Sequence, residues 1–369
     1  MVQIKELCSV VSGGTPSTEE SSFWNGNIQW FTPTEVGNNK YVTFSKRTIT
    51  ELGLKKSSAK LLPAGSILLS TRATVGEASI CTKECTTNQG FQSLIPNNKC
   101  CNEFLYYLIQ TKKKEMIKRS CGSTFNEISN SQVGSIKVRI PSLEQQMKIS
   151  KFLSHIDKRI DTQNKIISDL ESLYNGIKEK IIKCANNQQS IADFLEEVVK
   201  KTTVQDEFPV LSSTVKGLFL QTDYFKRNIA SENNIGYKIV KKNQIIISPQ
   251  NLWMGNMTFN DKFENGIVSP SYKVYKIKEG YDADYIVSIL TTKRAFYYYS
   301  QVSEQGASVV RRNLNIDAFE QLSFPVPSFE KQKEFSRLIR SIRNKLVCEN
   351  NYLENLILQK KYLLENLFI

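Results

Sequence analysis

The most regular pattern of apolar and polar residues occurs twice in this chain of 369 residues. Apolar residues recur every seven positions, in two rows, over residues 149–181 and again over residues 335–367. A seven-residue repeat of this length is typical of a helix that packs along a partner helix as a coiled coil. The sequence therefore predicts two long helices, one in the middle of the chain and one at its end.

Each predicted helix begins with the same short motif, PSLEQQ (141–146) or PSFEKQ (327–332), and the two motifs lie 186 residues apart. Ser142 is expected to cap the first helix, and Gln145 completes a capping box. Ser328 is the matching cap, although Lys331 replaces the glutamine of that box. The residues between the two rows of each helix are mostly charged or polar, so the rows form one apolar seam per helix. The seam residues of the first helix are Leu153, Ile160, Ile167, Tyr174, Ile181, Ile149, Ile156, Gln163, Leu170 and Ile177. Those of the second are Ile339, Leu346, Leu353, Lys360, Leu367, Phe335, Ile342, Glu349, Leu356 and Leu363.

Polar residues interrupt both seams at the same place. Gln163 and Glu349 are 186 residues apart and lie near the midpoints of the two helices. A single polar seam residue commonly sets register and orientation. We therefore predict that the helices pack antiparallel and that Gln163 meets Glu349. The alternative is that both side chains extend to solvent.

The repeat extends into the residues before each helix. GSILLSTRATVGEASI (65–80) matches NQIIISPQNLWMGNMT (243–258), and NQGFQSLIP (88–96) resembles SPSYKVYKI (269–277). Their short β-rich runs are bounded by Gly, Pro and Asn, which predicts strands. The periodicity of residues 102–119 and 283–301 predicts helices.

Each repeat also starts with matching apolar residues, from which we predict an opening helix. They are Leu7, Val10 and Val11 in the first repeat, and Leu195, Val198 and Val199 in the second. The predicted fold is α+β, with two mixed domains in tandem and two long antiparallel coiled-coil helices in an internal pseudo-twofold repeat. The predicted boundaries are 1–140 and 187–326 for the domains, and 141–186 and 327–369 for the helices.

The charge balance points to a polyanionic partner. The formal net charge is +13 and the sequence pI is about 9.2. Residues 142–184 and 328–369 carry only +2 and +3 of this charge, so most of the excess lies in the two domains. A basic domain favours nucleic acid as the partner. No run of eighteen apolar residues and no signal-peptide pattern occurs, so we expect a cytoplasmic protein without membrane contact.

The sequence offers little catalytic chemistry. It contains neither a G-x4-G-K-[ST] phosphate loop nor an [ND]-P-P-[YFW] methyltransferase tetrapeptide. The single histidine, His155, lies between seam residues, where a place on the helix surface is expected. Cys81 and Cys85 are too loosely spaced for a typical zinc site, so we expect reduced thiols and no metal. An enzyme with an unrecognised site around Cys85 is kept as a separate hypothesis.

Binding chemistry is better represented. Arg72 follows a predicted strand, where an arginine can reach a guanine edge, and the Asn88 and Gln89 amides can pair with adenine. The basic end of the helix at 112–119 suits phosphates, although a solvated charged face is the alternative. The candidate DNA-binding residues of the first domain are Arg72, Thr74, Asn88, Gln89, Lys112, Lys113, Lys118, Ser123 and Thr124. Those of the second are Gln250, Asn251, Trp253, Arg311 and Arg312.

Over essentially its full length the chain resembles the specificity (S) subunits of type I restriction-modification enzymes. The resemblance is carried by GGTPS with FWNGNIQWFTPTEV (13–36), STRATVG (70–76), TNQGF (87–91) and the two proline-led helix starts. The second domain departs from the family pattern, because it has no GGTP and carries SPQNLWMG in place of STRATVG.

The resemblance implies a non-catalytic subunit with two target-recognition domains, each of which binds half of a bipartite, asymmetric site in double-stranded DNA. The helices would set the gap and dock two modification subunits, which use S-adenosylmethionine to methylate adenine. Two restriction subunits, which use ATP and magnesium, would join in some systems. No cofactor is expected in this chain itself. The alternative function is a free-standing bivalent DNA-binding protein without enzyme partners.

Overall fold

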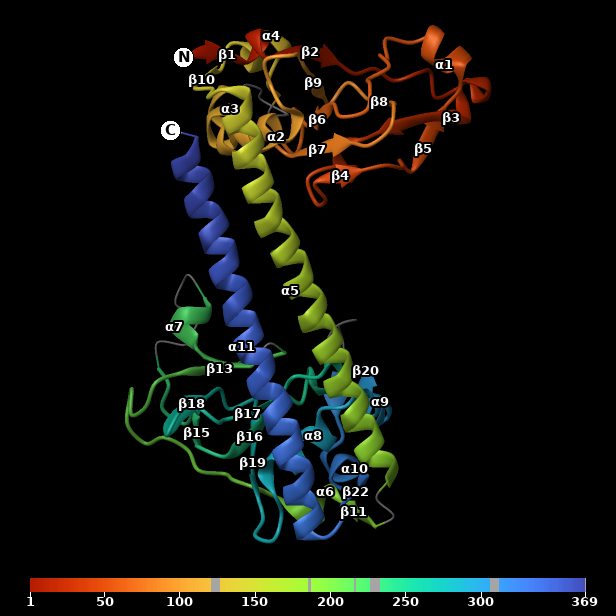
Figure 1. Cartoon of the computed structure of the whole chain (residues 1–369). Helices are drawn as coiled ribbons and strands as arrows, with labels where there is room; N and C mark the ends of the chain where they lie inside the picture. The colour runs from red at the N-terminus through yellow and green to blue at the C-terminus, as the bar shows by residue number, and fades with distance from the viewer. Residues whose placement is uncertain (121–126, 185–186, 216, 226–232, 306–311, 369) are drawn as a thin grey trace. The chain divides into compact units, whose positions relative to one another are not determined.

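The computed structural model describes residues 1–120, 127–184, 187–215, 217–225, 233–305 and 312–368. The chain divides into two compact units (Figure 1). Unit 1 comprises Met1–Asn164 with Tyr352–Ile369, and unit 2 comprises Lys165–Asn351. Each unit thus contains one globular region and half of each long helix.

Unit 1 is built on a five-stranded sheet with the order β2-β9-β6-β7-β4. Neighbouring strands are antiparallel, except that β4 runs parallel to β7. Side chains alternate between the two faces of a strand, so Ile67 and Leu69 join one core cluster and Leu68 joins another. The strands are β2 (Cys8–Ser12), β4 (Tyr41–Val42), β6 (Ile67–Leu69), β7 (Ala78–Cys81) and β9 (Gln92–Pro96).

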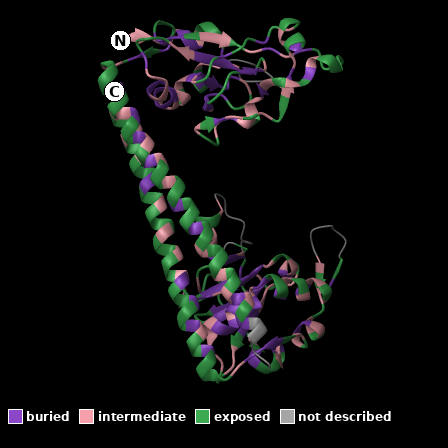
Figure 2. Ribbon diagram, turned by 45° about the vertical axis from the view of Figure 1, so that its right-hand side comes forward, coloured by how far each residue is buried: buried purple, intermediate pink, exposed green. Residues whose placement is uncertain are grey.

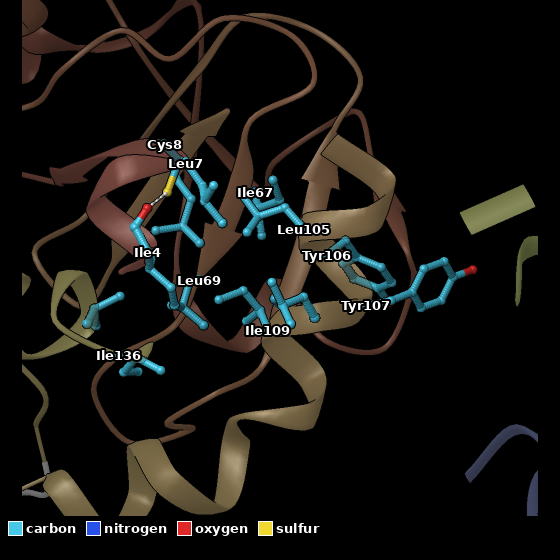
Figure 3. Close-up of a cluster of buried hydrophobic side chains, with 14 of the residues drawn as sticks. Ile4, Leu7, Cys8, Ile67, Leu69, Leu105, Tyr106, Tyr107, Ile109 and Ile136 are labelled. Atoms are coloured by element: carbon cyan, nitrogen blue, oxygen red, sulfur yellow. Dashed lines mark hydrogen bonds between the residues drawn. The ribbon is translucent and has the colours of Figure 1, made fainter. Parts of the chain in front are cut away.

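The larger core of unit 1 lies between this sheet and helix α2 (Asn102–Thr111). Figure 3 shows Leu105 and Ile109 of α2 beside Ile67 and Leu69 of β6, all fully buried. Burying apolar side chains on this scale is the main stabilising contribution to such a domain. The same cluster includes residues of the short elements at either end of the domain. These elements are β1 (Val2–Gln3), η1 (Ile4–Glu6), α3 (Lys113–Arg119), α4 (Asn130–Gly134) and β10 (Lys137–Val138), where β1 pairs with β10.

A second, three-stranded sheet of unit 1, with the order β5-β3-β8, contains the tryptophan-rich stretch. The Trp24 and Trp30 rings meet edge to face, with their centroids 5.1 Å apart. Each indole Nε1 donates a hydrogen bond to the GGTPS loop, Trp24 to Ser17 O and Trp30 to Gly14 O, both at 2.9 Å. The tryptophans therefore fix the conformation of that loop. The elements are η2 (Ser21–Phe23), β3 (Trp24–Phe31), η3 (Pro33–Glu35), β5 (Arg47–Ile49), α1 (Glu51–Lys55) and β8 (Cys85–Thr87).

Unit 2 repeats the main sheet of unit 1. Its four-stranded sheet has the order β12-β19-β16-β17, which corresponds strand for strand to β2-β9-β6-β7, and all its pairings are antiparallel. The predicted internal repeat is thereby confirmed. The shared elements are β11 (Gln188–Ser190), α6 (Ile191–Phe194), β12 (Leu195–Glu197), β16 (Gln244–Ile247), β17 (Met257–Phe259), β19 (Lys273–Ile277), α8 (Ala283–Leu290), α9 (Lys293–Gln301), α10 (Ile316–Glu320) and β22 (Ser323–Pro325), where β11 pairs with β22.

The units differ in the segment between the first strand and the next strand of the main sheet. In unit 2 this segment forms small two-stranded sheets in place of the tryptophan-rich sheet of unit 1. Strand β18 (Asn265–Val268), which pairs with β15 (Lys238–Lys241), has the chain position of β8 of unit 1, because β18 lies between β17 and β19 as β8 lies between β7 and β9. Among the described residues, the elements found only in unit 2 are β13 (Leu211–Thr214), β14 (Gly217–Leu220), α7 (Gln221–Tyr224), β15, η4 (Leu252–Met254), β20 (Ser303–Gln305) and β21 (Arg312–Leu314).

The predicted opening helices are wrong. Val10 and Val11 lie in strand β2, where they pair with Leu94 and Ser93 of β9. Leu195 likewise starts strand β12 and pairs with Ile277. Only a single short helical turn precedes each strand, η1 in unit 1 and α6 in unit 2. Pairing with a central strand has overridden a short apolar pattern that suits either structure.

The two long helices are confirmed as α5 (Leu143–Cys184) and α11 (Phe329–Leu367). In unit 1 Leu153, near the start of α5, shares a core with Leu367 at the end of α11. In unit 2 Ile181, near the end of α5, shares a core with Ile339 near the start of α11. The helices therefore run antiparallel, as predicted. All predicted seam residues are buried or half-buried, and Figure 2 shows the exposed residues between them along both helices.

The helix starts confirm one predicted cap and add an unpredicted anchor. Ser142 and Gln145 exchange the two hydrogen bonds of a capping box, at 3.3 and 3.4 Å. The next residue, Gln146, is buried and accepts a hydrogen bond from Cys101 N, which ties α5 to the start of α2. Gln332 in unit 2 is equally buried and accepts from Asp282 N at the start of α8. The final glutamine of each repeated motif thus joins the long helix to its domain.

Candidate nucleic-acid interface

Three sequence motifs of unit 1 meet at one place. Gly14 N of GGTPS donates to Thr87 O at 2.9 Å, and Thr71 N of STRATVG donates to Gly90 O at 2.8 Å. A Cβ atom on Gly13 would lie 2.0 Å from Asn88 O, so only glycine permits this close approach. The motifs GGTPS, STRATVG and TNQGF, far apart in sequence, therefore form one surface, which we call the unit 1 junction.

Arg72 is held at this junction by a residue that sequence analysis missed. Its Nε and Nη2 atoms both donate to Glu127 Oε2, at 3.1 and 2.9 Å. The backbone fixes the same contact, because Ile128 N donates to Thr71 O at 3.2 Å. The Arg72 side chain remains 43% exposed. Arg72 is therefore available to a ligand but restricted in orientation.

The loop that carries Arg72 is itself well ordered by hydrogen bonds. Ser70 and Thr74 share a hydroxyl hydrogen bond of 2.9 Å, and Gly76 N donates to Ser70 O at 2.9 Å. Gly76 has φ +88°, a left-handed conformation that favours glycine. Thr74 thus serves to close the loop, a role that leaves its predicted DNA contact untested.

Asn88 and Gln89 use their side-chain oxygens within the protein. Asn88 Oδ1 accepts a hydrogen bond from Gly90 N at 2.9 Å. Gln89 Oε1 accepts from the Thr15 hydroxyl, so Thr15 of the GGTPS motif is a second neighbour that sequence analysis missed. Adenine recognition needs an amide oxygen as well as an amide NH₂. Each amide oxygen already accepts one hydrogen bond within the protein, so a bidentate contact with adenine would use its second lone pair.

The basic residues of α2 and α3 differ in their surroundings. Lys113 forms an ion pair with Glu77, while Lys114 and Lys118 are exposed and Lys112 lies half-buried where α2 ends. An ion-paired lysine contributes less attraction to a phosphate than an uncompensated one. The predicted phosphate contacts at Lys112, Lys113 and Lys118 stay predictions.

The corresponding loop of unit 2 has a different composition around one arginine. The Arg312 guanidinium lies over the Trp253 ring, 4.3 Å from its centroid. Arg312 N donates to Gln250 O at 3.2 Å, and Asn251 N donates to Ser248 O at 3.0 Å within the loop. We call this cluster the unit 2 junction. Gln250, Asn251, Trp253 and Arg312 are thus brought together, whereas the predicted residues Ser123, Thr124 and Arg311 lie outside the described residues.

The polar residues of the helix seams occupy partly buried sites. Gln163 is 4% exposed, and Glu349 forms an ion pair of 2.6 Å with Lys345 on its own helix. A third polar seam residue, Lys360, forms an ion pair of 2.7 Å with Asp157 within unit 1. Glu349 and Lys360 are thus each accommodated in the seams by an ion pair. A meeting of Gln163 with Glu349 stays a prediction.

The cysteine-rich region has the properties of a packed core. Cys81 and Cys85 are buried free thiols. A hydrogen bond to Cys81, together with burial, raises the pKa of Cys85, and burial raises the pKa of Cys8 and of Cys100 to about 12. Thiols with such pKa values are protonated at neutral pH and are poor nucleophiles. Among the described residues, no three His, Cys, Asp or Glu side chains form a group suited to a metal ion.

Two further features bear on the sequence predictions. His155 is exposed on the surface of α5, where its Nδ1 atom lies 2.6 Å from Lys151 O. No helix in the described part of the chain combines the length and apolar character needed to cross a membrane.

Comparison with known proteins finds a family match in the N-terminal part of the chain. Residues 1–172 match the family model of the type I restriction modification DNA specificity domain. These residues are therefore similar to that family of specificity domains. The matched residues contain the whole unit 1 junction and more than half of α5.

Curated relatives of the chain are themselves specificity subunits. The MjaIX type I specificity subunit of Methanocaldococcus jannaschii is 39% identical over 46% of this chain and 40% of its own length. The EcoR124I/EcoR124II specificity subunit of Escherichia coli is 28% identical over 41% of this chain and 39% of its own length. The chain thus spans about two-fifths of the length of these relatives.

Solved structures extend the likeness in fold to the whole chain. The type I S subunit from M. genitalium covers 100% of this chain and 95% of its own length, with a TM-score of 0.59 at 14% identity. A chain from a study of complex assembly and conformational transition in a type I restriction-modification system gives a TM-score of 0.63 at 11% identity, covering 99% of this chain and 96% of its own. The second domain and α11 therefore follow the fold of specificity subunits even where the sequence departs from their motifs.

Proposed function

We propose that this chain is the DNA-specificity subunit of a type I restriction-modification system. Each domain would bind one half of a bipartite, asymmetric site in double-stranded DNA. The observation that carries the proposal is the repeated architecture: two domains with the same sheet order and different exposed loops, each joined by a buried glutamine to one of two antiparallel helices. Different loops on one scaffold suit two different half-sites.

The net charge of +13 supports a nucleic-acid ligand. The family assignment of residues 1–172 and the names of the curated relatives support recognition within a restriction-modification complex. The raised pKa values of Cys8, Cys85 and Cys100 argue against a nucleophilic role for these three thiols.

The proposed partners are double-stranded DNA and two modification subunits, with restriction subunits in some assemblies. S-adenosylmethionine would be bound by the modification subunits, and ATP with magnesium by the restriction subunits. This chain would hold none of these cofactors and would work in the cytoplasm. Its long helices would dock the modification subunits and set the gap between the two half-sites.

The test is co-expression of the full chain with its candidate modification subunits, followed by sequencing of methylated adenines in the host DNA. The expected result is a stable complex and one methylated motif of two short halves separated by a fixed gap. DNA binding by the chain without any complex or methylation would favour the free-standing bivalent DNA-binding protein.

A second experiment addresses the role of the helices. Lengthening α5 and α11 together, by one matched heptad each, should lengthen the gap and leave both half-sites unchanged. The matched control substitutes exposed residues on the same helices and leaves the length of both helices and their seam residues unchanged. An unchanged gap in the lengthened variant would show that the helices do not set it.

A further inference from the structure

Among the described residues, each junction presents one arginine, and the surroundings of the two arginines differ. In unit 1 the loop supplies Arg72 and the segment entering α4 supplies Glu127. In unit 2 the segment entering α10 supplies Arg312 and the loop supplies Trp253. One backbone hydrogen bond joins loop and segment in each case, Ile128 N to Thr71 O and Arg312 N to Gln250 O. At the equivalent backbone contact, the arginine of unit 1 is ion-paired with a glutamate, whereas the arginine of unit 2 is stacked on a tryptophan.

The contact in unit 1 leaves a defined edge of Arg72 free. A guanidinium has five N–H groups, and Nε–H and one N–H of Nη2 are directed at Glu127 Oε2. The free edge consists of one N–H of Nη1 and the second N–H of Nη2, which point the same way. Two parallel N–H donors match the O6 and N7 acceptors of guanine in the major groove.

The same contact changes the electrostatics of the site. The Glu127 carboxylate lies 2.9 Å from Nη2 and offsets the charge of the arginine. A neutral pair gains little from a phosphate, whereas its free N–H donors can still form directional hydrogen bonds with a base edge. In unit 2, the ion pairs found among the described residues do not include Arg312, which stacks on a neutral indole instead.

We propose that Glu127 is a positioning residue that makes Arg72 select guanine in one half-site, and that suppresses the binding of Arg72 to backbone phosphate. This inference rests on the proposed function. Arg72 would contact the base, and Glu127 would act only through Arg72. Arg312, stacked on Trp253, would keep its full charge and bind phosphate as well as base.

The experiment compares four variants in the full complex with the modification subunits: Glu127→Gln, Arg72→Ala, the double variant, and Glu115→Gln. Glu115 pairs with Arg119 on α3, so Glu115→Gln removes the same charge from an ion pair of unit 1 outside the junction. The methylated motif is sequenced for each variant. A bidentate contact discriminates between bases by about 5- to 150-fold. Glu127→Gln should lose most of that preference at one guanine, and the other half-site should stay unchanged.

A second measurement separates positioning from a merely structural role. The full chain alone is bound to a non-specific duplex at several salt concentrations. Glu127→Gln should bind more tightly than the wild type, with a salt dependence steeper by about one phosphate contact. Arg72→Ala should show no such gain, and the double variant should match Arg72→Ala.

The outcomes are distinct. A wild-type complex without a bipartite motif would contradict the proposed function, while the salt measurement would still test Glu127. A wild-type motif that Glu127→Gln leaves unchanged would overturn the inference alone, as would the absence of guanine from both half-sites. If Glu127→Gln failed to fold, recognition of the other half-site would also be lost. Glu127→Asp, which keeps the charge on a shorter side chain, should then restore DNA binding with part of the preference for guanine.

Discussion

The two domains share what holds them together and differ in what they expose. Strands β2, β9, β6 and β7 of unit 1 and β12, β19, β16 and β17 of unit 2 have one order, and Gln146 and Gln332 make equivalent anchors. The inserted segments and the two junctions differ, with tryptophans and a compensated arginine in one domain and a stacked arginine in the other. The difference teaches that the sheet and helix starts are constrained by packing, whereas the loops are free to diverge.

The glutamine anchors give the largest expected effect. Gln146 also donates from Nε2 to Lys99 O and Pro141 O, at 3.1 and 3.0 Å, whereas within the described part of the chain Gln332 donates to Pro327 O alone, at 2.8 Å. Orphaning a buried polar group costs about 1–3 kcal/mol. Gln146→Ala should therefore lower the free energy of unfolding of unit 1 by about 3 kcal/mol, and Gln332→Ala should lower that of unit 2 by somewhat less. Chemical denaturation measures the loss, and hydrogen exchange assigns it to one unit.

The matched control for that comparison is Gln145→Ala, which removes only an exposed capping partner and should cost about 1 kcal/mol. Each glutamine variant should weaken its own unit alone. Equal losses of protection in both units after a single substitution would contradict independent anchors.

The helix charges give the next effect. Asp157 accepts from Lys360 at 2.7 Å and from the buried Tyr107 hydroxyl at 2.5 Å, so it serves two partners. Its repeat counterpart, Arg343, shares Asp284 with Arg340. Removing Asp157, which serves both Lys360 and Tyr107, should lower the free energy of unfolding by about 2 kcal/mol. Removing Arg343 should lower it by less than about 1 kcal/mol, because Arg340 still pairs with Asp284.

Asp157→Ala and Arg343→Ala would be compared by the denaturant midpoint of each unit, with exposed Asp161→Ala as the control. A greater loss of stability in Arg343→Ala than in Asp157→Ala would contradict this ranking of the two ion-pair clusters.

The scaffold was more predictable from the sequence than the site. Heptads and capping residues predicted both long helices, because these depend on local spacing. The repeated apolar runs predicted the strands but not the opening strand β2, since Val10 and Val11 pair with β9, more than eighty residues away. Glu127 could not be linked to Arg72 from spacing alone, because the two residues are 55 positions apart in the sequence.

A buried lysine separates the units in their response to pH. Lys178 in unit 2 is 5% exposed and donates to Thr291 O and Oγ1, and its repeat counterpart in unit 1 is the apolar Leu364. Burial lowers the pKa of Lys178 from 10.5 to about 8. Above pH 8 the unfolded state binds more protons than the folded state, so the free energy of unfolding of unit 2 rises with pH until about 10.5.

The rise should be about 1 kcal/mol between pH 7 and 9, measured by urea denaturation of the wild type against Lys178→Met. The methionine variant removes the titrating group and keeps most of the side-chain volume, so its stability should lack this rise. Unit 1 provides the internal control. A stability of unit 2 that falls over this range in the wild type but not in the variant would refute the assignment.

The smallest expected effect concerns the surface of the tryptophan-rich sheet, which unit 2 lacks. The Arg47 guanidinium lies 3.6 Å from the Trp24 ring centroid and 5.5 Å from that of Trp30. Because Arg47 is exposed, the cation–π contact should contribute only about 0.5–1 kcal/mol, so Arg47→Ala should lower the stability of unit 1 by that amount and Arg47→Lys by less. Lys46→Ala, an exposed neighbour, serves as the control for loss of charge. Trp24 and Trp30 also hold the GGTPS loop through their indole hydrogen bonds. If Arg47→Ala lost base selectivity in one half-site without any change in stability, Arg47 would contact DNA directly instead of only stabilising the two tryptophans.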